Sequence, residues 1–365
     1  MPTPRLFEPI SLRSLTLPNR IVVAPMCQYE AVEGDATAWH HVHLGSLACG
    51  SPGLLLLEAT AVEARGRITP GCLGLWNDAN EAALARVLES IRAVAPDAPI
   101  GIQLAHAGIK ASRHRPFKAP RRGYVTPEEG GWAPVGLSAI PSGGDGPVAV
   151  ELDERGLAEV RDAFAEAAGR AVRLGFDLIE LHSAHGYLLS SALSGLTNRR
   201  TDRYGGSLEN RMRFPLEVFE AMRAAMPDSM PLGVRFSGTD WADDRGGWTI
   251  EDSVAYAAAL EDRGCDYAHL SSGGNASGVS IDVHPGFQVP LAAAVKRGTG
   301  IVTIAVGELQ DPHLAEKVLA DGDADLIAIG KGMLRDPRWP WHAAQTLGHA
   351  LEVVPNYRWC VPVDA

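Results

Sequence analysis

Residues 176–187 read FDLIELHSAHGY and give the clearest indication of the fold class. Their first part, Leu178–His182, is a nearly continuous apolar run, and such a run suits a strand that is buried on both faces, as in a parallel sheet. Helical patterns lie on either side of it, at Glu154–Leu174 and at Glu209–Met226. A buried strand between two helices is the repeating element of an α/β protein.

The same alternation extends through the chain in both directions. Further apolar runs stand at Ile21–Pro25, Gly53–Ala61, Ile100–His106, Leu232–Phe236, Tyr267–Ser271, Ile301–Val306 and Leu326–Gly330. Helical patterns stand between them at His40–Ala48, Glu81–Val94, Ile250–Arg263, Pro290–Lys296, Pro312–Ala320 and Trp339–Leu347. About eight β–α pairs predict an α/β fold, a (β/α)8 TIM barrel formed by a single domain over residues 1–365. A doubly wound open sheet is the alternative.

The composition limits what the protein binds. Its 33 Lys and Arg against 44 Asp and Glu give a net charge of −11, which disfavours nucleic acid and an anionic membrane surface. No run approaches the roughly 20 apolar residues of a membrane span, and the N-terminus lacks the form of a signal peptide. Five scattered cysteines without a CxxC pair argue against disulfides, zinc or an iron–sulfur cluster. We therefore expect a cytoplasmic protein with no metal site.

Residues 111–150 break the rhythm of strands and helices. The segment is rich in Gly, Pro and basic residues and has no clear period. A connection of this length inside a compact domain is usually a functional loop. Because it follows the third predicted strand, a barrel would place it over the active-site face as a lid. The alternative is a disordered insertion, against which the aromatic residues Tyr124 and Trp132 argue.

His182, His185 and Tyr187 form the sharpest cluster of reactive side chains. They stand where the fourth predicted strand ends, and the active sites of TIM barrels lie at such ends. Two imidazoles three residues apart can converge on one carbonyl oxygen or anion, and the nearby phenol can donate a proton to carbon. Two alternatives stay open from the residues alone: core histidines with a packing tyrosine, or a metal site that takes Glu180 as a third ligand.

Other strand ends carry residues that suit an electron-rich, phosphorylated ligand. Arg235 lies inside an apolar run, where a guanidinium needs either a salt bridge or a ligand that gathers negative charge. Gln103 is either a satisfied amide or a reader of a heterocycle edge. Glycines follow the sixth, seventh and eighth strands, and Lys331 adds a charge there, so this end of the barrel suits a phosphate.

Together these residues resemble the old yellow enzyme family of FMN-dependent ene-reductases, in particular its bacterial branch of NADPH dehydrogenases and xenobiotic reductases. The resemblance runs from Leu6 to about Pro337 and so covers nearly the whole chain. It is carried by the motifs LPNRI (17–21), PMCQY (25–29), GRIT (66–69), QLAHAG (103–108), HGYL (185–188) and, above all, NRRTDRYGGSLENR (198–211).

The resemblance implies noncovalent FMN at the carboxyl ends of the strands. Arg235 would favour the negative charge of reduced flavin, Cys27 would modulate its potential, and Gly330 with Lys331 would hold its phosphate. From the residues alone, Cys27 could also be a buried small side chain. The implied cofactor-binding residues are Ala24, Pro25, Met26, Cys27, Ala59, Gln103, Arg235, Ser272, Gly307, Gly330 and Lys331.

The resemblance also implies the reduction of activated C=C bonds in α,β-unsaturated aldehydes, ketones, imides or nitroalkenes. NADPH, or NADH, would first deliver hydride to flavin N5 and leave, and the alkene would then occupy the same place, which gives ping-pong kinetics. His182 and His185 would bind the substrate carbonyl, or a phenolic ligand in its place, with Tyr29 on the substrate side. Hydride would reach the β-carbon while Tyr187 protonates the α-carbon.

The implied assembly is a homodimer or homotetramer in which Arg358 reaches a neighbouring substrate site. Two positions depart from the pattern of the branch. Lys331 stands where Arg is usual and cannot form the bidentate fork on phosphate, and Ile109 stands where Arg or another group is frequent. Three other functions remain as alternatives: a flavin-free, phosphate-binding aldolase or isomerase, a reductase of the dienoyl-CoA type, and a flavin-binding sensor without catalysis.

Overall fold

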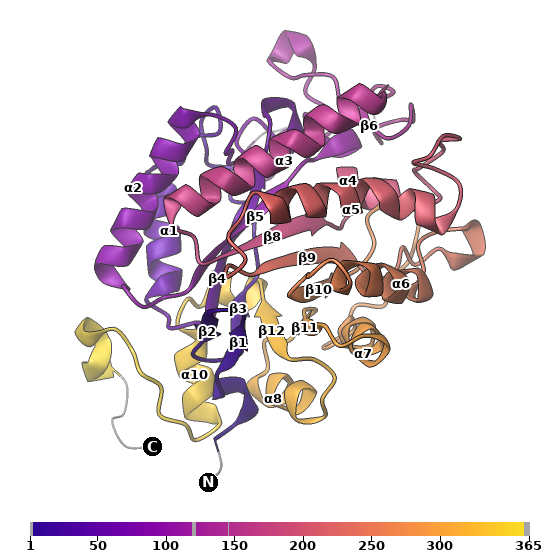
Figure 1. Ribbon diagram of the computed structural model, residues 1–365. Helices are drawn as coiled ribbons and strands as arrows, with labels where there is room; N and C mark the ends of the chain where they lie inside the picture. Colours follow the sequence, from indigo (N-terminus) through magenta and orange to yellow (C-terminus); the bar gives the residue numbers. More distant parts are fainter. Residues whose placement is uncertain (1–2, 119–121, 145, 361–365) are drawn as a thin grey trace.

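A closed barrel of eight parallel strands forms the centre of the molecule (Figure 1). The computed structural model describes residues 3–118, 122–144 and 146–360. Around the barrel the strands follow the order β3 (Ile21–Val23), β4 (Leu54–Ala61), β5 (Ile100–Ala105), β8 (Leu178–Ser183), β9 (Leu232–Ser237), β10 (Tyr267–Ser271), β11 (Val302–Ala305) and β12 (Leu326–Ile329), and β12 pairs with β3. The predicted TIM barrel is therefore confirmed, and the open sheet is wrong.

Helices cover the outside of the barrel (Figure 1): α1 (Ala38–Ala48), α2 (Asp78–Val94), α3 (Glu154–Leu174), α5 (Leu208–Ala224), α6 (Ile250–Glu261), α7 (Val289–Gly298), α8 (Pro312–Ala320) and α10 (Trp339–Thr346). The ends of α3 show why the sequence is helical there. Asp153 caps the first turn by accepting the Gly156 N–H at 2.7 Å, and Gly175 ends the helix with a left-handed φ of 77°. The predicted helix ends differ from the observed ones by three residues or fewer.

The barrel interior is apolar near the amino ends of the strands. The inward side chains there form one buried cluster of Val22, Leu54, Leu56, Leu178, Tyr267, Ile304 and Leu326. A hairpin of β1 (Ile10–Leu12) and β2 (Leu15–Leu17) closes this end, because Leu12 and Leu17 belong to the same cluster. The hairpin was not predicted, since three-residue strands are too short to show an alternating pattern.

Several short elements lie outside the predicted pattern. Helices α4 (Leu188–Leu193) and α9 (Lys331–Arg335) begin soon after β8 and β12, and β6 (Val135–Gly136) pairs with β7 (Val150–Glu151) inside residues 111–150. Short 3-10 helices stand at Arg5–Phe7, Ala64–Gly66, Gly108–Lys110, Pro127–Glu129, Asp243–Arg245 and Pro355–Cys360. The predicted segment 111–150 thus contains local structure of its own.

The segment 111–150 packs against the loop that follows β4; its positions 119–121 and 145 lie outside the described residues. The Trp132 indole donates to the Arg65 carbonyl at 2.8 Å, and the Arg67 guanidinium lies 4.8 Å from the centre of the Trp132 ring. The Tyr124 hydroxyl donates to the Trp132 carbonyl at 3.0 Å. Because Arg65 and Arg67 follow the carboxyl end of β4, these contacts place the segment beside the carboxyl ends of the strands.

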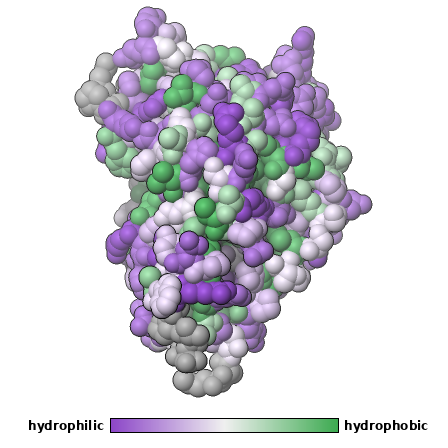
Figure 2. All heavy atoms as spheres, turned by 90° about the vertical axis from the view of Figure 1, so that its left-hand side faces the viewer, coloured by the Kyte–Doolittle hydropathy of each residue, from purple (hydrophilic) through white to green (hydrophobic). Residues whose placement is uncertain are grey.

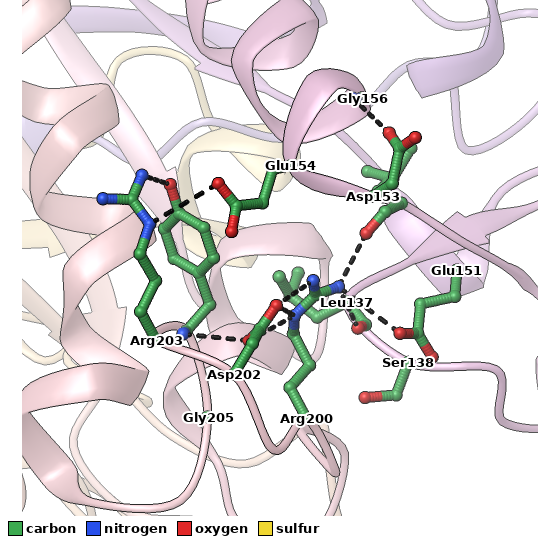
Figure 3. Close-up of polar contacts among 12 residues, drawn as sticks. Leu137, Ser138, Glu151, Asp153, Glu154, Gly156, Arg200, Asp202, Arg203 and Gly205 are labelled. Carbon is green, nitrogen blue, oxygen red and sulfur yellow. Dashed lines mark hydrogen bonds and ion pairs between the residues drawn. The ribbon is translucent and has the colours of Figure 1, made fainter.

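The loop between α4 and α5, which holds the first part of the long motif 198–211, contacts this segment (Figure 3). Arg200 donates to the carbonyl oxygens of Leu137 at 3.0 Å and Leu152 at 2.6 Å, and its guanidinium pairs with Asp202. Arg203 lies 3.8 Å from the Glu154 carboxylate at the start of α3. Arg200 therefore joins the segment, through Leu137, to the loop between α4 and α5, and Arg203 joins this loop to the start of α3.

No helix among the described residues is long and apolar enough to cross a membrane. Figure 2 shows the face formed by the left-hand side of Figure 1, where hydrophobic residues are interspersed among hydrophilic ones. Scattered apolar residues of this kind are ordinary on a protein surface.

Candidate active site

The two histidines and the tyrosine meet above the carboxyl end of β8. His182 is 3% exposed, and the next turn is tight because His185 and Gly186 have left-handed φ values of 61° and 72°. This turn brings the chain back over the strand. His185 Nδ1 consequently lies 3.3 Å from His182 Nε2, and the ring centres of His182 and Tyr187 lie 5.0 Å apart. The structure therefore brings the predicted cluster together in space.

Burial keeps the groups of this cluster uncharged. Burial, and then the Arg235 cation, lower the pKa of both His182 and His185 well below the usual value, so both imidazoles are neutral at pH 7. Burial raises the pKa of Tyr187 well above 10.0, so its phenol keeps its proton. The cluster can therefore donate hydrogen bonds and one phenolic proton.

Lys110 is a further residue of the site and was not predicted. Its ammonium donates to the carbonyl oxygens of His185 and Gly274, both at 2.6 Å, and lies 5.9 Å from the centre of the Tyr187 ring. Burial, and then Arg113, lower the pKa of Lys110 to about 8. Its position, two residues after the motif QLAHAG at a predicted strand end, is the feature of the sequence that could have identified it.

Arg235 in β9 is a buried cation that lacks an ion pair within the part of the chain that the structure describes. It is 8% exposed, its register neighbours are His182 on β8 and His269 on β10, and its Nε has no hydrogen-bond partner. The salt bridge considered from the sequence is thus not formed among these residues. A buried guanidinium with an unpaired N–H needs an acceptor, which a bound ligand can supply.

Glu180 carries a second buried charge, next to Gln103 and His269. Its carboxylate is fully buried, accepts the Gln103 Nε2–H at 2.7 Å and lies 2.9 Å from His269 Nδ1. As for a metal site, residues 3–118, 122–144 and 146–360 hold no group of three or more His, Cys, Asp or Glu side chains placed to bind an ion. Glu180 instead fixes the orientation of the Gln103 amide.

The segment after β3 lies beside the end of β12, since the Ala24 N–H donates to the carbonyl of the last β12 residue at 3.1 Å. Glu58 of β4 holds the segment from the other side by accepting the Gln28 N–H at 2.9 Å. Burial, and then the Glu58 carboxylate, raise the pKa of Cys27 well above 9.0, so its thiol is protonated. Tyr29 follows with a left-handed φ of 58°.

Glycines follow the ends of β11 and β12, and Lys331 adds one positive charge there. Gly307 has a φ of 121°, and a Cβ there would lie 3.0 Å from Gln288 Oε1, so the position requires glycine. Lys331, the first residue of α9, pairs with the Glu308 carboxylate, and its side chain is 77% exposed. The Lys331 ammonium is therefore paired with a carboxylate of its own chain.

The predicted cofactor residues share one end of the barrel. They lie in the strands or at the strand ends on the carboxyl side, which is where this fold places its sites: Ala24, Pro25, Met26, Cys27, Ala59, Gln103, Arg235, Ser272, Gly307, Gly330 and Lys331. The predicted substrate residues Tyr29, His182, His185 and Tyr187 stand at the same end.

Arg358 lies apart from these residues. Its guanidinium is 3.8 Å from the Glu352 carboxylate. Together with Pro96 and Pro99 it lines a cavity of about 520 Å³, and no other residue lining this cavity was predicted to act in the site. Because Pro96 and Pro99 directly precede β5, this cavity is at the amino end of the barrel, opposite the histidines. The predicted substrate contact of Arg358 therefore requires a second copy of the chain.

The chain is similar over nearly its whole length to known flavin oxidoreductases. The profile of the NADH:flavin oxidoreductase / NADH oxidase family matches residues 5–349. An NADH:flavin oxidoreductase of Gibberella zeae is 40% identical, over 97% of this chain and 89% of its own length. The NADPH dehydrogenase of Geobacillus thermodenitrificans is 40% identical, over 96% of this chain and 97% of its own. Morphinone reductase, also solved in complex with tetrahydroNAD, matches with a TM-score of 0.77 and 29% identity, over 96% of this chain and 91% of its own.

Proposed function

Because this chain belongs to the NADH:flavin oxidoreductase / NADH oxidase family, the old yellow enzyme family that its motifs predicted, we propose that it is an FMN-dependent ene-reductase. Its substrates are alkenes activated by a carbonyl or nitro group: enals, enones, unsaturated imides and nitroalkenes. The observation that carries the proposal is the neutral His182–His185–Tyr187 cluster beside the unpaired Arg235 cation. Such a site binds an oxygen that gains negative charge and protonates a neighbouring carbon.

The residues at the carboxyl ends of the strands fit FMN. Arg235 has an unpaired, buried N–H to offer an electron-rich ring, and Gly307, Gly330 and Lys331 offer backbone and one cation to a phosphate. When bound, FMN supplies the acceptor and donor of hydride between the nicotinamide and the alkene. The names of the relatives, NADPH dehydrogenase and a reductase solved with tetrahydroNAD, support NADPH or NADH as reductant.

Side chains of the protein bind the activating oxygen of the alkene and supply the proton for its α-carbon. His182 and His185 donate hydrogen bonds to the carbonyl or nitro oxygen, and these bonds strengthen as negative charge develops on it. Tyr187, whose phenol is held next to His182, donates its proton to the α-carbon. Tyr29 contacts the substrate from the side of β3. Reductant and alkene share one place, so the kinetics are ping-pong.

We also propose that the protein is a single domain and that the segment 111–150 acts as a lid over its active-site face. Its hydrogen bond from Trp132 to Arg65 and its anchor through Arg200 hold it next to the strand ends. From the resemblance we also propose assembly as a homodimer or homotetramer, in which Arg358, at the amino end of its own barrel, contacts the substrate site of a second copy. We further propose that the protein acts in the cytoplasm.

An anaerobic visible spectrum tests the proposal. The purified protein with FMN is titrated first with NADPH and then with 2-cyclohexenone. We expect flavin absorbance that bleaches with NADPH and returns with the enone. A bound flavin that NADPH leaves oxidised would favour a flavin-binding sensor, and a protein that takes up no flavin would favour a flavin-free enzyme at the same phosphate site.

A further inference from the structure

Ser271 of β10 contacts His185 of the histidine pair. It is the last residue of β10, it is 5% exposed, and its Oγ lies 2.7 Å from His185 Nε2. The other ring nitrogen of His185, Nδ1, lies 3.3 Å from His182 Nε2. The two nitrogens of one imidazole thus face two different partners. Those partners decide which nitrogen carries the proton.

The backbone places the proton of His182. The Ala184 N–H donates to His182 Nδ1 at 3.2 Å, so that nitrogen is unprotonated, and a neutral imidazole then carries its proton on Nε2. In the free protein His182 Nε2–H therefore donates to His185 Nδ1. His185 must consequently carry its own proton on Nε2 and donate it to Ser271 Oγ.

When an oxygen atom binds between the two rings, His185 Nδ1 has to donate a hydrogen bond and no longer accept one. An oxygen placed between the rings accepts the His182 Nε2–H, but it would face the lone pair of His185 Nδ1 and be repelled. His185 becomes a second donor only in the Nδ1–H form, and its buried Nε2 then requires a donor. The Ser271 hydroxyl can rotate to donate, and Gln288 Nε2, 3.5 Å from Ser271 Oγ, can in turn donate to that oxygen.

We propose that Ser271 is a positioning residue that converts His185 from acceptor to donor when a carbonyl, nitro or phenolate oxygen binds. The hydroxyl reverses its hydrogen bond, one proton leaves Nε2 and one arrives at Nδ1 through water, and the net charge is unchanged. The inference rests on the proposed function, since it needs an oxygen ligand between His182 and His185. It explains how two neutral imidazoles in contact can both donate to one oxygen.

Nitrogen NMR of the FMN-loaded protein with ring-¹⁵N histidine, free and with 4-hydroxybenzaldehyde, tests the proposal. Unprotonated and protonated ring nitrogens give separate signals, and a His185→Asn sample assigns those of His185. We expect Nδ1 to be unprotonated in the free protein and protonated in the complex, with Nε2 the reverse. Ser271→Ala should lose this exchange of protons between the ring nitrogens. It should also bind the phenol about tenfold more weakly, because His185 would no longer donate a hydrogen bond to the charged phenolate oxygen. Ser271→Thr, which keeps the hydroxyl, should restore both.

Ser183→Ala is the matched control, because Ser183 is a buried serine next to His182 in sequence that faces the outside of the barrel. It should bind the phenol like the unmodified protein and keep the exchange. An Nδ1 that stays unprotonated in the complex, or a Ser271→Ala variant with unchanged affinity, would overturn this inference alone. A loaded, unmodified protein that does not bind the phenol would overturn the proposed function together with it.

Discussion

The two halves of the barrel interior are built from the same strands and differ in chemistry. Toward the amino ends, Leu178 of β8 and Tyr267 of β10 pack in an apolar cluster that Leu12 of the hairpin helps to close. Two residues further along the same strands stand Glu180 and His269, which bond to each other at 2.9 Å. A step of two residues, about 7 Å along a strand, thus separates a packed core from a polar site.

This difference shows how one scaffold provides both stability and chemistry. The lower half is apolar except for the buried Tyr267 hydroxyl, and its packed side chains stabilise the closed barrel through the burial of apolar surface. The upper half tolerates buried charge because Glu180 is bonded to Gln103 and His269. Arg235 departs from this pattern, with an unpaired Nε, and so identifies where a ligand belongs.

Loss of the phenol of Tyr187 should show the largest effect in the upper half. We expect Tyr187→Phe to slow alkene reduction by about 10²–10⁴-fold, because it removes the proton donor, and to leave flavin reduction by NADPH nearly unchanged. Stopped-flow absorbance measures the two half-reactions separately. Equal slowing of both would mean that Tyr187 shapes the site without acting as the acid. A protein that stays as stable as the unmodified one is the control for folding.

Removal of the buried carboxylate of Glu180 should cost stability and also alter the site. Glu180→Ala leaves the Gln103 and His269 groups without a partner, and breaking such a buried pair costs about 3–5 kcal/mol. Urea unfolding measures the loss, and the absorption spectrum of bound flavin should shift as Gln103 becomes free to turn. An unchanged spectrum would show that Glu180 has no influence on the cofactor end.

A cavity in the lower half should cost stability alone. Leu178→Ala should lower the free energy of unfolding by about 2–5 kcal/mol, as for other buried leucines, and leave the flavin spectrum as it is. This variant is the counterpart of Glu180→Ala, two residues away on the same strand. If it also changed the spectrum or the rate of alkene reduction, the division of the interior into two independent halves would be wrong.

Acid should destabilise the protein through a carboxylate at the rim of the upper half. Burial alone would raise the pKa of Glu63, but the hydrogen bonds from His106 and then from Arg65 lower it from 4.5 to about 2. The ionised form therefore stabilises the native state at and above pH 4.5, and this contribution, about 3 kcal/mol, is lost as the pH falls toward 2. Urea unfolding of Glu63→Gln at a series of acidic pH values should show a flatter pH dependence. A parallel dependence would refute the assignment.

The smallest effect concerns the pair at the phosphate end. Glu308→Gln removes the carboxylate that pairs with Lys331, so FMN should bind up to about fivefold more tightly, the range of an exposed ion pair. Riboflavin, which has no phosphate, should bind as before. Flavin fluorescence titration measures both. A gain for riboflavin as large as that for FMN would place Glu308 away from the phosphate.

Local pattern predicted the elements of this fold closely. The barrel strands carry continuous apolar runs, and Tyr267–Ser271 and Leu178–His182 were located to within one residue. The site residues were found because polar side chains such as His182 and Arg235 interrupt those runs. The hairpin of residues 10–17 and Lys110 were missed, since neither breaks a periodic pattern and both acquire their meaning from distant contacts.

By itself the sequence determined which segments are strands and helices and which residue types stand at the strand ends, because burial on two faces or one leaves a periodic record along the chain. Only the tertiary structure decided which of those residues meet. It put Ser271 against His185 across 86 positions of sequence, paired Lys331 with Glu308, and set Arg358 at the far end of the barrel. Such pairings join residues far apart in the chain and depend on the way the barrel closes, which a local period of the sequence does not show.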